Sequence, residues 1–163
     1  MFITNHALAG AAIGAVVRRP VPALVTGVAS HVVMDLTLHF GEPDMEWDEF
    51  IKLARVDGTI GLAVTAAVAA TAPASVRRSA LAGLAGACLI DLDKPGRHFF
   101  GRSPFPAAVD RFHARIQNEA PKGRWVEAVT AAALVAALAA AFRNRSAGSG
   151  PVARPARPPT RRP

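Results

Sequence analysis

Residues 20–40 read PVPALVTGVASHVVMDLTLHF, an apolar run in which no lysine, arginine, aspartate or glutamate precedes Asp35. Proline cannot continue the interior of a helix, so Pro20 and Pro22 separate this run from the apolar residues before it. His31 and Asp35 are four residues apart and therefore share one face of a helix. Ionisable groups in apolar surroundings are costly unless they are paired or bind a metal. The run predicts a buried helix that carries a polar site.

Four other apolar runs predict helices of the same kind. We expect helices over residues 5–17, 21–40, 57–73, 79–91 and 124–142. A bilayer core requires about 20 helical residues. Residues 58–76 reach that length, residues 21–40 and 125–142 approach it, and residues 79–91 are too short alone. We see no strand pattern and no repeat. The expected fold is all-α, a five-helix integral membrane bundle over residues 1–142, with a soluble alanine-rich helical protein as the alternative.

The composition favours close helix packing. Apolar residues make up 51% of the 163, there is no tyrosine, and the mean hydropathy is +0.24. Small residues such as Gly10 and Gly14 let membrane helices approach one another. Cys88 is the only cysteine, which excludes an intramolecular disulfide and two-cysteine zinc motifs, and we expect it to be a core residue. The N-terminus lacks the basic start of a secretory signal.

Three segments do not read as spans. Residues 41–56 mix five acids with Met45, Trp47 and Phe50, and residues 92–123 include an amphipathic stretch, Ala107 to Ala120. Both are typical of elements at a membrane interface, although residues 41–56 also fit a solvated loop. Residues 143–163 hold six arginines, five prolines and no acid. That composition predicts a disordered basic tail, which could touch anionic lipids. We expect no specific nucleic-acid partner, because the body lacks a basic helix with aromatics.

The helix count sorts the charges onto two ends of the bundle. One end, with the N-terminus and residues 41–56 and 92–123, receives every acid and every histidine. The other end receives ten arginines and no acid: Arg18, Arg19, Arg77, Arg78, Arg143, Arg145, Arg154, Arg157, Arg161 and Arg162. Short basic loops tend to stay cytoplasmic. We therefore expect a protein of the cell membrane whose basic tail is cytoplasmic.

The acidic end gathers side chains suited to a metal. We expect the ligands to be His6, His31, Asp35, Asp91 and Asp93, with Asp35 and Asp93 as the catalytic carboxylates. Imidazole and carboxylate together are ligands for zinc or manganese, and a bound divalent ion activates water and polarises an ester or phosphoryl oxygen. Asp91 and Asp93 end a predicted helix, where the dipole disfavours an acid.

Other residues at this end have simpler interpretations. His39 reads as a solvated helix end and Asp57 as the N-cap of the helix over residues 57–73. His98 and His113 read as surface residues.

Three short patches resemble one family. Ser30-His31-Val32-Val33-Met34-Asp35 is similar to the S-H-x-x-x-D motif of the inner-membrane-associated metal-dependent hydrolases. Leu89-Ile90-Asp91-Leu92-Asp93-Lys94-Pro95 resembles their L-P-D-I-D-H-P segment, and Asn5-His6 resembles an early G-H. The two longer patches stand in reverse order here, Lys94 replaces a histidine, and the H-R-x-x-T-H motif is absent. The resemblance implies a helical membrane protein with a His/Asp metal site and hydrolytic activity, by analogy.

The sequence leaves three functions open. The first is a membrane protein with a metal-dependent hydrolase site for a phosphoester or lipid substrate. The second is a non-enzymatic membrane protein whose buried His and Asp handle protons or ions. The third is a scaffold in which these groups hold helices together. Neither the substrate nor the oligomeric state follows from the sequence.

Overall fold

The chain folds as helices in the computed structural model, which describes residues 1–42 and 44–147, with side chains through residue 144. In chain order the elements are α1 (Ile3–Val17), α2 (Pro20–Leu36), α3 (Trp47–Thr71), α4 (Arg77–Cys88), η1 (Ile90–Leu92), α5 (Asp93–Phe100), α6 (Ala107–Ile116), η2 (Pro121–Gly123) and α7 (Arg124–Ala147). The only strand-like feature in the described residues is an isolated parallel bridge between His39 and Glu119. The all-α prediction is confirmed.

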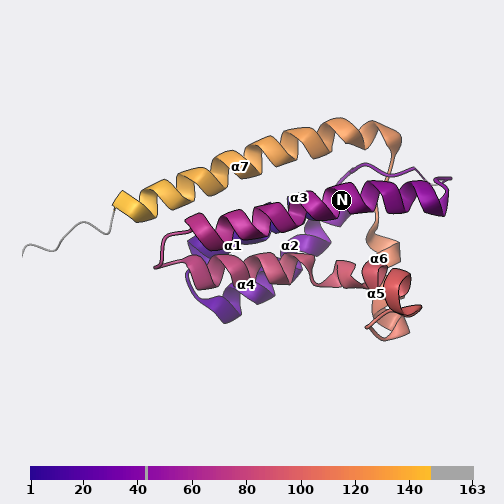
Figure 1. The fold of residues 1–163 in the computed structure, drawn as a ribbon, viewed down its shortest axis with the longest axis horizontal. Helices are drawn as coiled ribbons and strands as arrows, with labels where there is room; N and C mark the ends of the chain where they lie inside the picture. Colours follow the sequence, from indigo (N-terminus) through magenta and orange to yellow (C-terminus); the bar gives the residue numbers. More distant parts are fainter. Residues whose placement is uncertain (43, 148–163) are drawn as a thin grey trace, which may run out of the picture.

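Small residues bring α4 against α1 and α2, as Figure 1 shows. Gly83 of α4 faces Gly10 of α1, and a Cβ atom added to either glycine would collide with the backbone of the other. Gly14 meets the backbone at Ser79 in the same way, and Gly27 of α2 meets Gly83. The close approach expected at Gly10 and Gly14 is therefore present. It aligns three helices whose ends carry the polar site.

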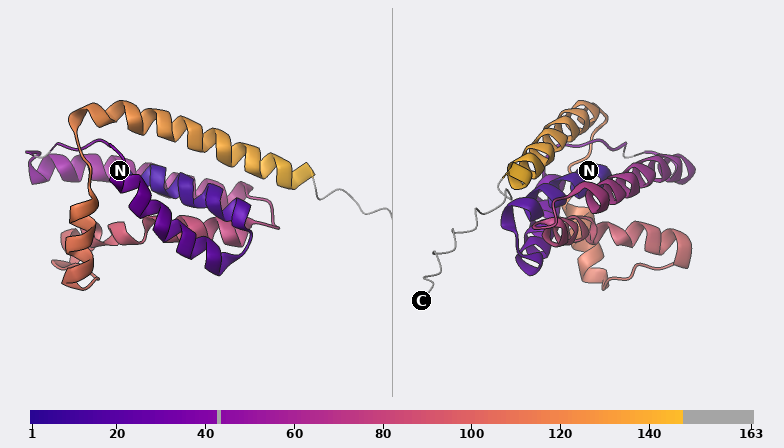
Figure 2. Two further views of the ribbon diagram at one scale, coloured as in Figure 1. Left: turned by 180° about the vertical axis from the view of Figure 1, so that it is seen from behind. Right: turned by 60° about the vertical axis from the view of Figure 1, so that its left-hand side comes forward.

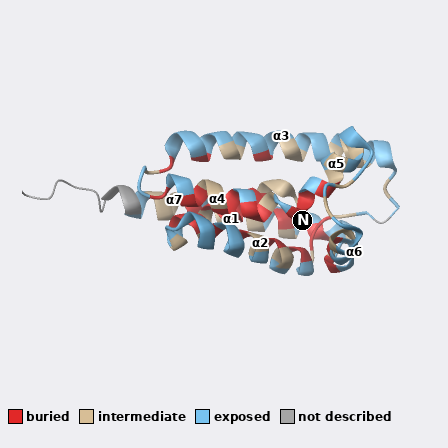
Figure 3. Cartoon of the chain, turned by 90° about the horizontal axis from the view of Figure 1, so that it is seen from below, coloured by how far each residue is buried: buried red, intermediate tan, exposed pale blue. Residues whose placement is uncertain are grey.

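The apolar core lies among α1, α3, α4 and α7, and Figure 3 shows buried residues concentrated on the inner faces of the bundle. Two stretches, Trp47–Thr71 and Pro121–Asn144, are long and apolar enough to cross a membrane, and most of their residues are exposed. The apolar helices α1 and α2 are shorter. A 15-residue helix covers about 22 Å, less than the roughly 30 Å of a hydrocarbon core. Five complete spans therefore remain a proposal.

Two predicted boundaries are wrong. Helix α2 ends at Leu36 rather than at residue 40, because the backbone is extended from Thr37 and pairs with residues 118–120. Helix α3 begins at Trp47 rather than at residue 57. Asp48 and Glu49 lie in its first turn, where carboxylates interact favourably with the helix dipole. The acidic segment is therefore half helix.

The last predicted boundary falls inside α7, which continues past residue 142 to Ala147. The rest of the basic tail, residues 148–163, lies outside the described residues.

The helices α5 and α6 lie at one end of the bundle. Figures 1 and 2 show the turn between α1 and α2, the turn between α3 and α4, and the C-terminal end of α7 at the opposite end. The bridge between His39 and Glu119 attaches the segment after α6 to the segment after α2, through hydrogen bonds from His39 N to Asn118 O and from Ala120 N to His39 O. This attachment places α6 over the end of α2.

Candidate metal centre

The structure brings together all five predicted site residues, in buried positions at the α5–α6 end of the bundle. His6 comes from α1, His31 and Asp35 from α2, and Asp91 and Asp93 from η1 and the start of α5. Their ligand atoms fall into overlapping groups, each with all its atoms within 4.8 Å of one another. A sixth residue, His113 of α6, belongs to two of these groups.

The Asp35 carboxylate lies at the centre of three imidazoles. Its Oδ1 is 3.1 Å from His6 Nε2, and its Oδ2 is 3.0 Å from His31 Nε2 and 3.4 Å from His113 Nε2. His6 and His31 stack with ring centroids 4.1 Å apart. The Met1 amino group also contacts Oδ1, at 2.8 Å. With Gln117 Nε2, which donates to Oδ2 at 2.7 Å, five nitrogen groups surround this one buried carboxylate.

A carbonyl oxygen assigns the tautomer of His31. Its Nδ1 lies 2.8 Å from the Ala87 carbonyl oxygen, which only accepts hydrogen bonds, so Nδ1 carries the proton and donates it. In the neutral ring Nε2 then presents a lone pair toward Asp35 and His113. This arrangement is typical of metal-bound histidines, whose second nitrogen donates to a carbonyl or carboxylate.

Asp93 accepts a hydrogen bond from Nδ1 of His113, as the Ala87 carbonyl oxygen does from His31. Its Oδ2 lies 3.3 Å from His113 Nδ1, while the Nε2 of that ring faces Asp35 and lies 3.6 Å from Asp91 Oδ1. Burial alone would lower the pKa of His113, but hydrogen bonds to Asp35 and Asp93 raise it to about 9. Without a metal, His113 is therefore protonated at neutral pH. Asp93 lies behind His113, a position that favours orienting the ring over binding metal.

Asp91 joins the cluster to its surroundings. Its Oδ1 accepts a hydrogen bond from Lys94, and its Oδ2 lies 4.0 Å from His6 Nε2 and 3.9 Å from His31 Nδ1. Burial opposes ionisation, but Lys94 and the histidines outweigh it and lower the pKa of Asp91 to about 2. The predicted dipole penalty at Asp91 and Asp93 does not apply. Helix α4 ends at Cys88, and Asp93 lies in the first turn of α5.

The cluster fits a metal ion in two respects. First, Asp91 Oδ2 is buried without a hydrogen-bond partner in the described residues, and buried polar atoms are seldom left so. Second, the Nε2 atoms of His31 and His113 are 3.3 Å apart. Ligands at the zinc distances of 2.0–2.1 Å in a tetrahedron are about 3.3 Å from one another. In the metal-free protein the proton on His113 Nε2 lies between the two atoms, and a bound cation would take the place of that proton.

Other polar residues of the acidic end have separate roles. His39 is buried, but its ring contacts the Thr37 carbonyl oxygen and Gln117 Oε1, at 2.9 and 3.1 Å. Asp57 lies inside α3 and accepts hydrogen bonds from the backbone of Ile3 and Thr4, so it caps α1 rather than its own helix. The predicted cap is therefore wrong.

Sequence reasoning missed His113 and Gln117. His113 reads as a surface residue, yet it is three residues before Ile116 and four after Val109, on the apolar face of the amphipathic stretch, and it is 2% exposed. That shared face was the available signal. Gln117 follows one turn later and donates from Nε2 to Asp35 Oδ2 at 2.7 Å. No local pattern marks Gln117, because its partner is 82 residues away.

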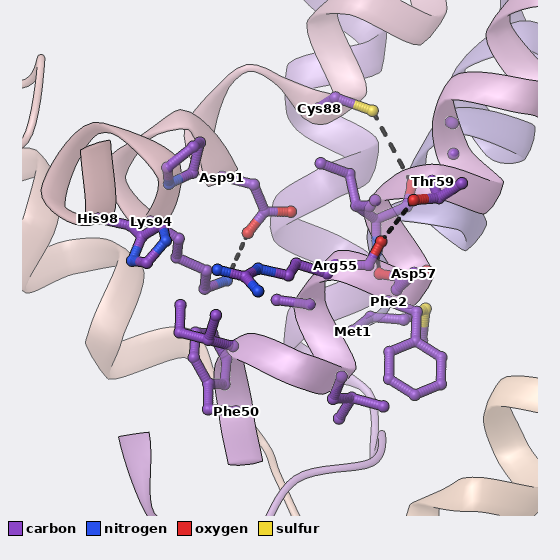
Figure 4. Close-up of a pocket in the computed structure, with 18 of the residues that line it drawn as sticks. Met1, Phe2, Phe50, Arg55, Asp57, Thr59, Cys88, Asp91, Lys94 and His98 are labelled. Carbon is purple, nitrogen blue, oxygen red and sulfur yellow. Dashed lines mark hydrogen bonds and ion pairs between the residues drawn. The ribbon is translucent and has the colours of Figure 1, made fainter. Parts of the chain in front are cut away.

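A cavity of about 700 Å³ opens beside the cluster. Asp91 and Lys94 form the wall nearest the metal groups, and Figure 4 shows them beside Arg55 and His98. The opposite wall is the inner face of α3. The buried cluster therefore has an approach for a small molecule.

We found no match to this chain among family models, curated proteins or solved structures. The function must be argued from the site itself.

Proposed function

We propose that this chain is a membrane-associated, metal-dependent hydrolase of an ester or phosphoester. The observation that supports it is the convergence of three imidazole Nε2 atoms, from His6, His31 and His113, on the carboxylates of Asp35 and Asp91, with Asp91 Oδ2 left unpartnered. This set of nitrogen and oxygen ligands suits zinc or manganese. A hydrolytic metal site also needs an approach for its substrate, and the cavity beside Asp91 offers one.

Five side chains form the proposed ligand set. His6, His31, His113, Asp35 and Asp91 would hold the ion. A divalent ion held there supplies Lewis acidity, which makes water a stronger acid and polarises an ester or phosphoryl oxygen.

Three residues outside the ligand set have roles of their own. Asp93 orients His113 through Oδ2, and its unpartnered Oδ1 is placed to accept a proton. Gln117 holds Asp35. Lys94 lies at the cavity wall, where burial would lower its pKa but Asp91 raises it, so its ammonium group can stabilise negative charge on a substrate oxygen.

Membrane attachment is the second part of the proposal. The helices α3 and α7 are long enough to cross a bilayer, and large apolar side chains such as Leu62 and Trp125 are exposed on them. Exposed apolar surface of this extent marks a membrane or protein interface. The arginine end would face the cytoplasm. A fluorescent protein fused after Pro163 should glow in cells, and a dark, exported fusion would reverse this orientation.

Metal analysis of detergent-purified protein tests the hydrolase. After loading with zinc and gel filtration, the wild type should retain stoichiometric metal, and His31→Ala and Asp35→Asn should lose it. His98→Ala, outside the ligand set, is the control. The wild type should hydrolyse p-nitrophenyl phosphate or p-nitrophenyl acetate, and a chelator should abolish the activity. Sub-stoichiometric zinc in the wild type would refute the proposal.

One observation favours proton or ion handling instead. Contacts run from the partly exposed Glu119 to His39 at 3.7 Å, from His39 to Gln117, and from Gln117 to Asp35. A non-enzymatic protein of this kind would function without tightly bound metal, so the same metal analysis separates the two candidates. If the cluster only holds the helices together, His31→Ala should lower the stability of the protein and change no other property.

A further inference from the structure

The cavity beside the metal cluster is elongated. Its lining follows α3 from Trp47 to Thr65, a distance of about 27 Å at 1.5 Å per residue. The rest of the wall comes from the start of α1, the end of α4, the helix α5, the segment between α2 and α3, and Glu119. Its volume of about 700 Å³ lies within the roughly 300–1,000 Å³ of small-molecule sites. A long, narrow site suits an extended chain better than a compact metabolite.

Most of the length of the cavity is apolar. Phe2, Phe50, Ile51, Leu62 and Leu84 are among the residues that line it. Leu62 is 72% exposed although it lines the cavity, and it belongs to a helix that is able to cross a membrane. The apolar part therefore borders the surface at which we expect lipid.

Charged groups gather midway along the α3 lining, where Arg55 lies beside Lys94 and Asp91. In the described structure each acid of the lining is already engaged: Asp91 by Lys94, Glu42 by Arg124, Glu119 by His39, and Asp57 by the α1 backbone. Arg55 makes no ion pair among the described residues, and Figure 4 shows its guanidinium extended into the cavity on the side of Lys94 and Asp91. Arginine binds phosphate through two parallel hydrogen bonds.

Charge balance agrees with an anionic ligand. With a divalent ion bound and neutral histidines, two charges of the ion, one of Lys94 and one of the Met1 amino group balance the four carboxylates of Asp35, Asp57, Asp91 and Asp93. The charge of Arg55 is then left over at the cavity wall, and it calls for an anion placed between Arg55 and the metal.

We propose that the cavity binds an amphiphilic phosphate ester, a lipid whose phosphate lies between Arg55, Lys94 and the metal cluster and whose hydrocarbon chain lies along α3. This inference rests on the proposed function and names its substrate class. Hydrolysis of such an ester joins the oxygen of water to phosphorus, breaks the P–O bond to the leaving alcohol, and transfers a proton of the water to the alcohol oxygen.

Quenching of Trp47 measures this binding without requiring catalysis. Trp47 lines the cavity and Trp125 does not, so a Trp125→Phe background leaves one reporter. The probes are stearyl phosphate and the matching uncharged stearyl alcohol, both titrated into zinc-loaded protein in the same alkyl maltoside micelles. Each carries a nitroxide on the chain next to its head group, because Trp47 packs on His98 near the charged groups of the cavity. The phosphate should reach half-maximal quenching at a concentration at least about tenfold lower than the alcohol requires, as expected for a charge-assisted hydrogen bond. Ethyl phosphate should not displace it at equal concentration.

Two pairs of variants locate the head and the chain. Arg55→Gln should reduce the preference for the phosphate over the alcohol, although Lys94 and the ion remain, whereas Lys52→Gln, one turn away and outside the lining, should leave that preference unchanged. Gly58→Phe should block both probes, because a Cβ there enters open space within the lining. Val56→Phe, outside the lining, should block neither.

The outcomes separate the two proposals. Equal binding of phosphate and alcohol by the wild type, or equal effects of Arg55→Gln and Lys52→Gln, would overturn the lipid phosphate site even if zinc binds stoichiometrically. Failure to bind zinc refutes the hydrolase through the metal analysis alone.

Discussion

Replacing Asp93 with asparagine tests whether this residue acts through His113. Its Oδ2 lies 3.3 Å from His113 Nδ1, and asparagine keeps the size of the side chain but provides a weaker, uncharged acceptor. Loss of a carboxylate that orients a metal-bound histidine lowers metal affinity about 10–100-fold. That factor corresponds to about 1.4–2.7 kcal/mol. We expect the zinc affinity of Asp93→Asn to fall by this factor at pH 9.

The deficit should shrink as the pH falls. In the wild type, Asp35 and Asp93 raise the pKa of His113 to about 9 against the opposing effect of burial. Below that pH zinc must displace the proton of His113, and its apparent affinity falls. Removing the charge of Asp93 lowers the pKa of His113, so the variant has less proton to displace. At low pH the lost orientation of the ring weakens zinc binding while the lower pKa of His113 favours it, so the two effects partly cancel. At pH 9 only the lost orientation remains.

Competition with a chelator at pH 9.0, 7.5 and 6.5 measures the affinity, and calorimetry in buffers of different ionisation enthalpy counts the protons released. Asp110→Asn is the matched control, because Asp110 belongs to the same helix as His113 but pairs with Arg97 and Ser103. A change under about threefold at pH 9, less than 1 kcal/mol, would refute the reasoning. A loss far beyond 100-fold, more than an orienting residue causes, would make Asp93 a ligand, as the sequence predicted.

Three further outcomes follow from the described contacts. The pKa of His113 in the folded protein, about 9, exceeds the ordinary histidine pKa of 6.5, so its contribution to the stability of the metal-free protein is complete below pH 6.5 and is lost as the pH rises to about 9. Thermal unfolding of the metal-free wild type, compared with His113→Gln, should show this slope, and identical slopes would contradict it. Asp57→Ala removes the acceptor for the backbone N–H groups of Ile3 and Thr4 and should cost about 0.5–2 kcal/mol in unfolding measurements, with the exposed Asp48→Ala as a control that costs less. Gly83→Ala places a Cβ against the Gly10 carbonyl and should destabilise by about 1–3 kcal/mol, whereas Gly58→Ala, which meets no atom within 4 Å, should be neutral or stabilising; a similar loss in both would refute the packing argument.

The central helices were predictable because their signals are local. Apolar length, proline breaks and glycine spacing identify α1, α2 and α4, and the i, i+4 spacing of His31 and Asp35 places both on one face. The same signals failed at the ends of the helices. Residues 37–40 leave the helix because they pair with residues 118–120, and residues 47–56 join α3 although their acids read as a surface segment. Such contacts are set by distant chain and leave no pattern in a short window.

The buried His/Asp cluster was predictable in part for the same reason. His6, His31, Asp35, Asp91 and Asp93 stand at the ends of apolar runs, and the antiparallel order of the runs brings those ends together. His113 lies on a separate helix, α6. The backbone hydrogen bonds between residues 37–40 and 118–120 hold this helix over the end of α2. Its position on the apolar face of α6 was visible in the sequence, but its partners were not.

The two motifs that resemble the family, residues 30–35 and 89–95, stand in reverse order along this chain. The arrangement of the bundle shows how the same side chains can still meet. The end of α2 and the end of α4 lie at the same end of an antiparallel bundle, so their side chains meet whichever helix comes first in the chain. Reversing the order of the two motifs changes which segments connect the helices. In this chain the segment after α4 contains α6, which carries His113. That residue brings a third Nε2 to Asp35, at 3.4 Å, while Lys94 stands where the family motif has a histidine. The geometry therefore predicts that Lys94→His does not rescue zinc binding in His113→Ala, because Lys94 contacts Asp91 from the cavity side rather than Asp35. Restored stoichiometric zinc in the double variant would show instead that position 94 can still supply the missing ligand.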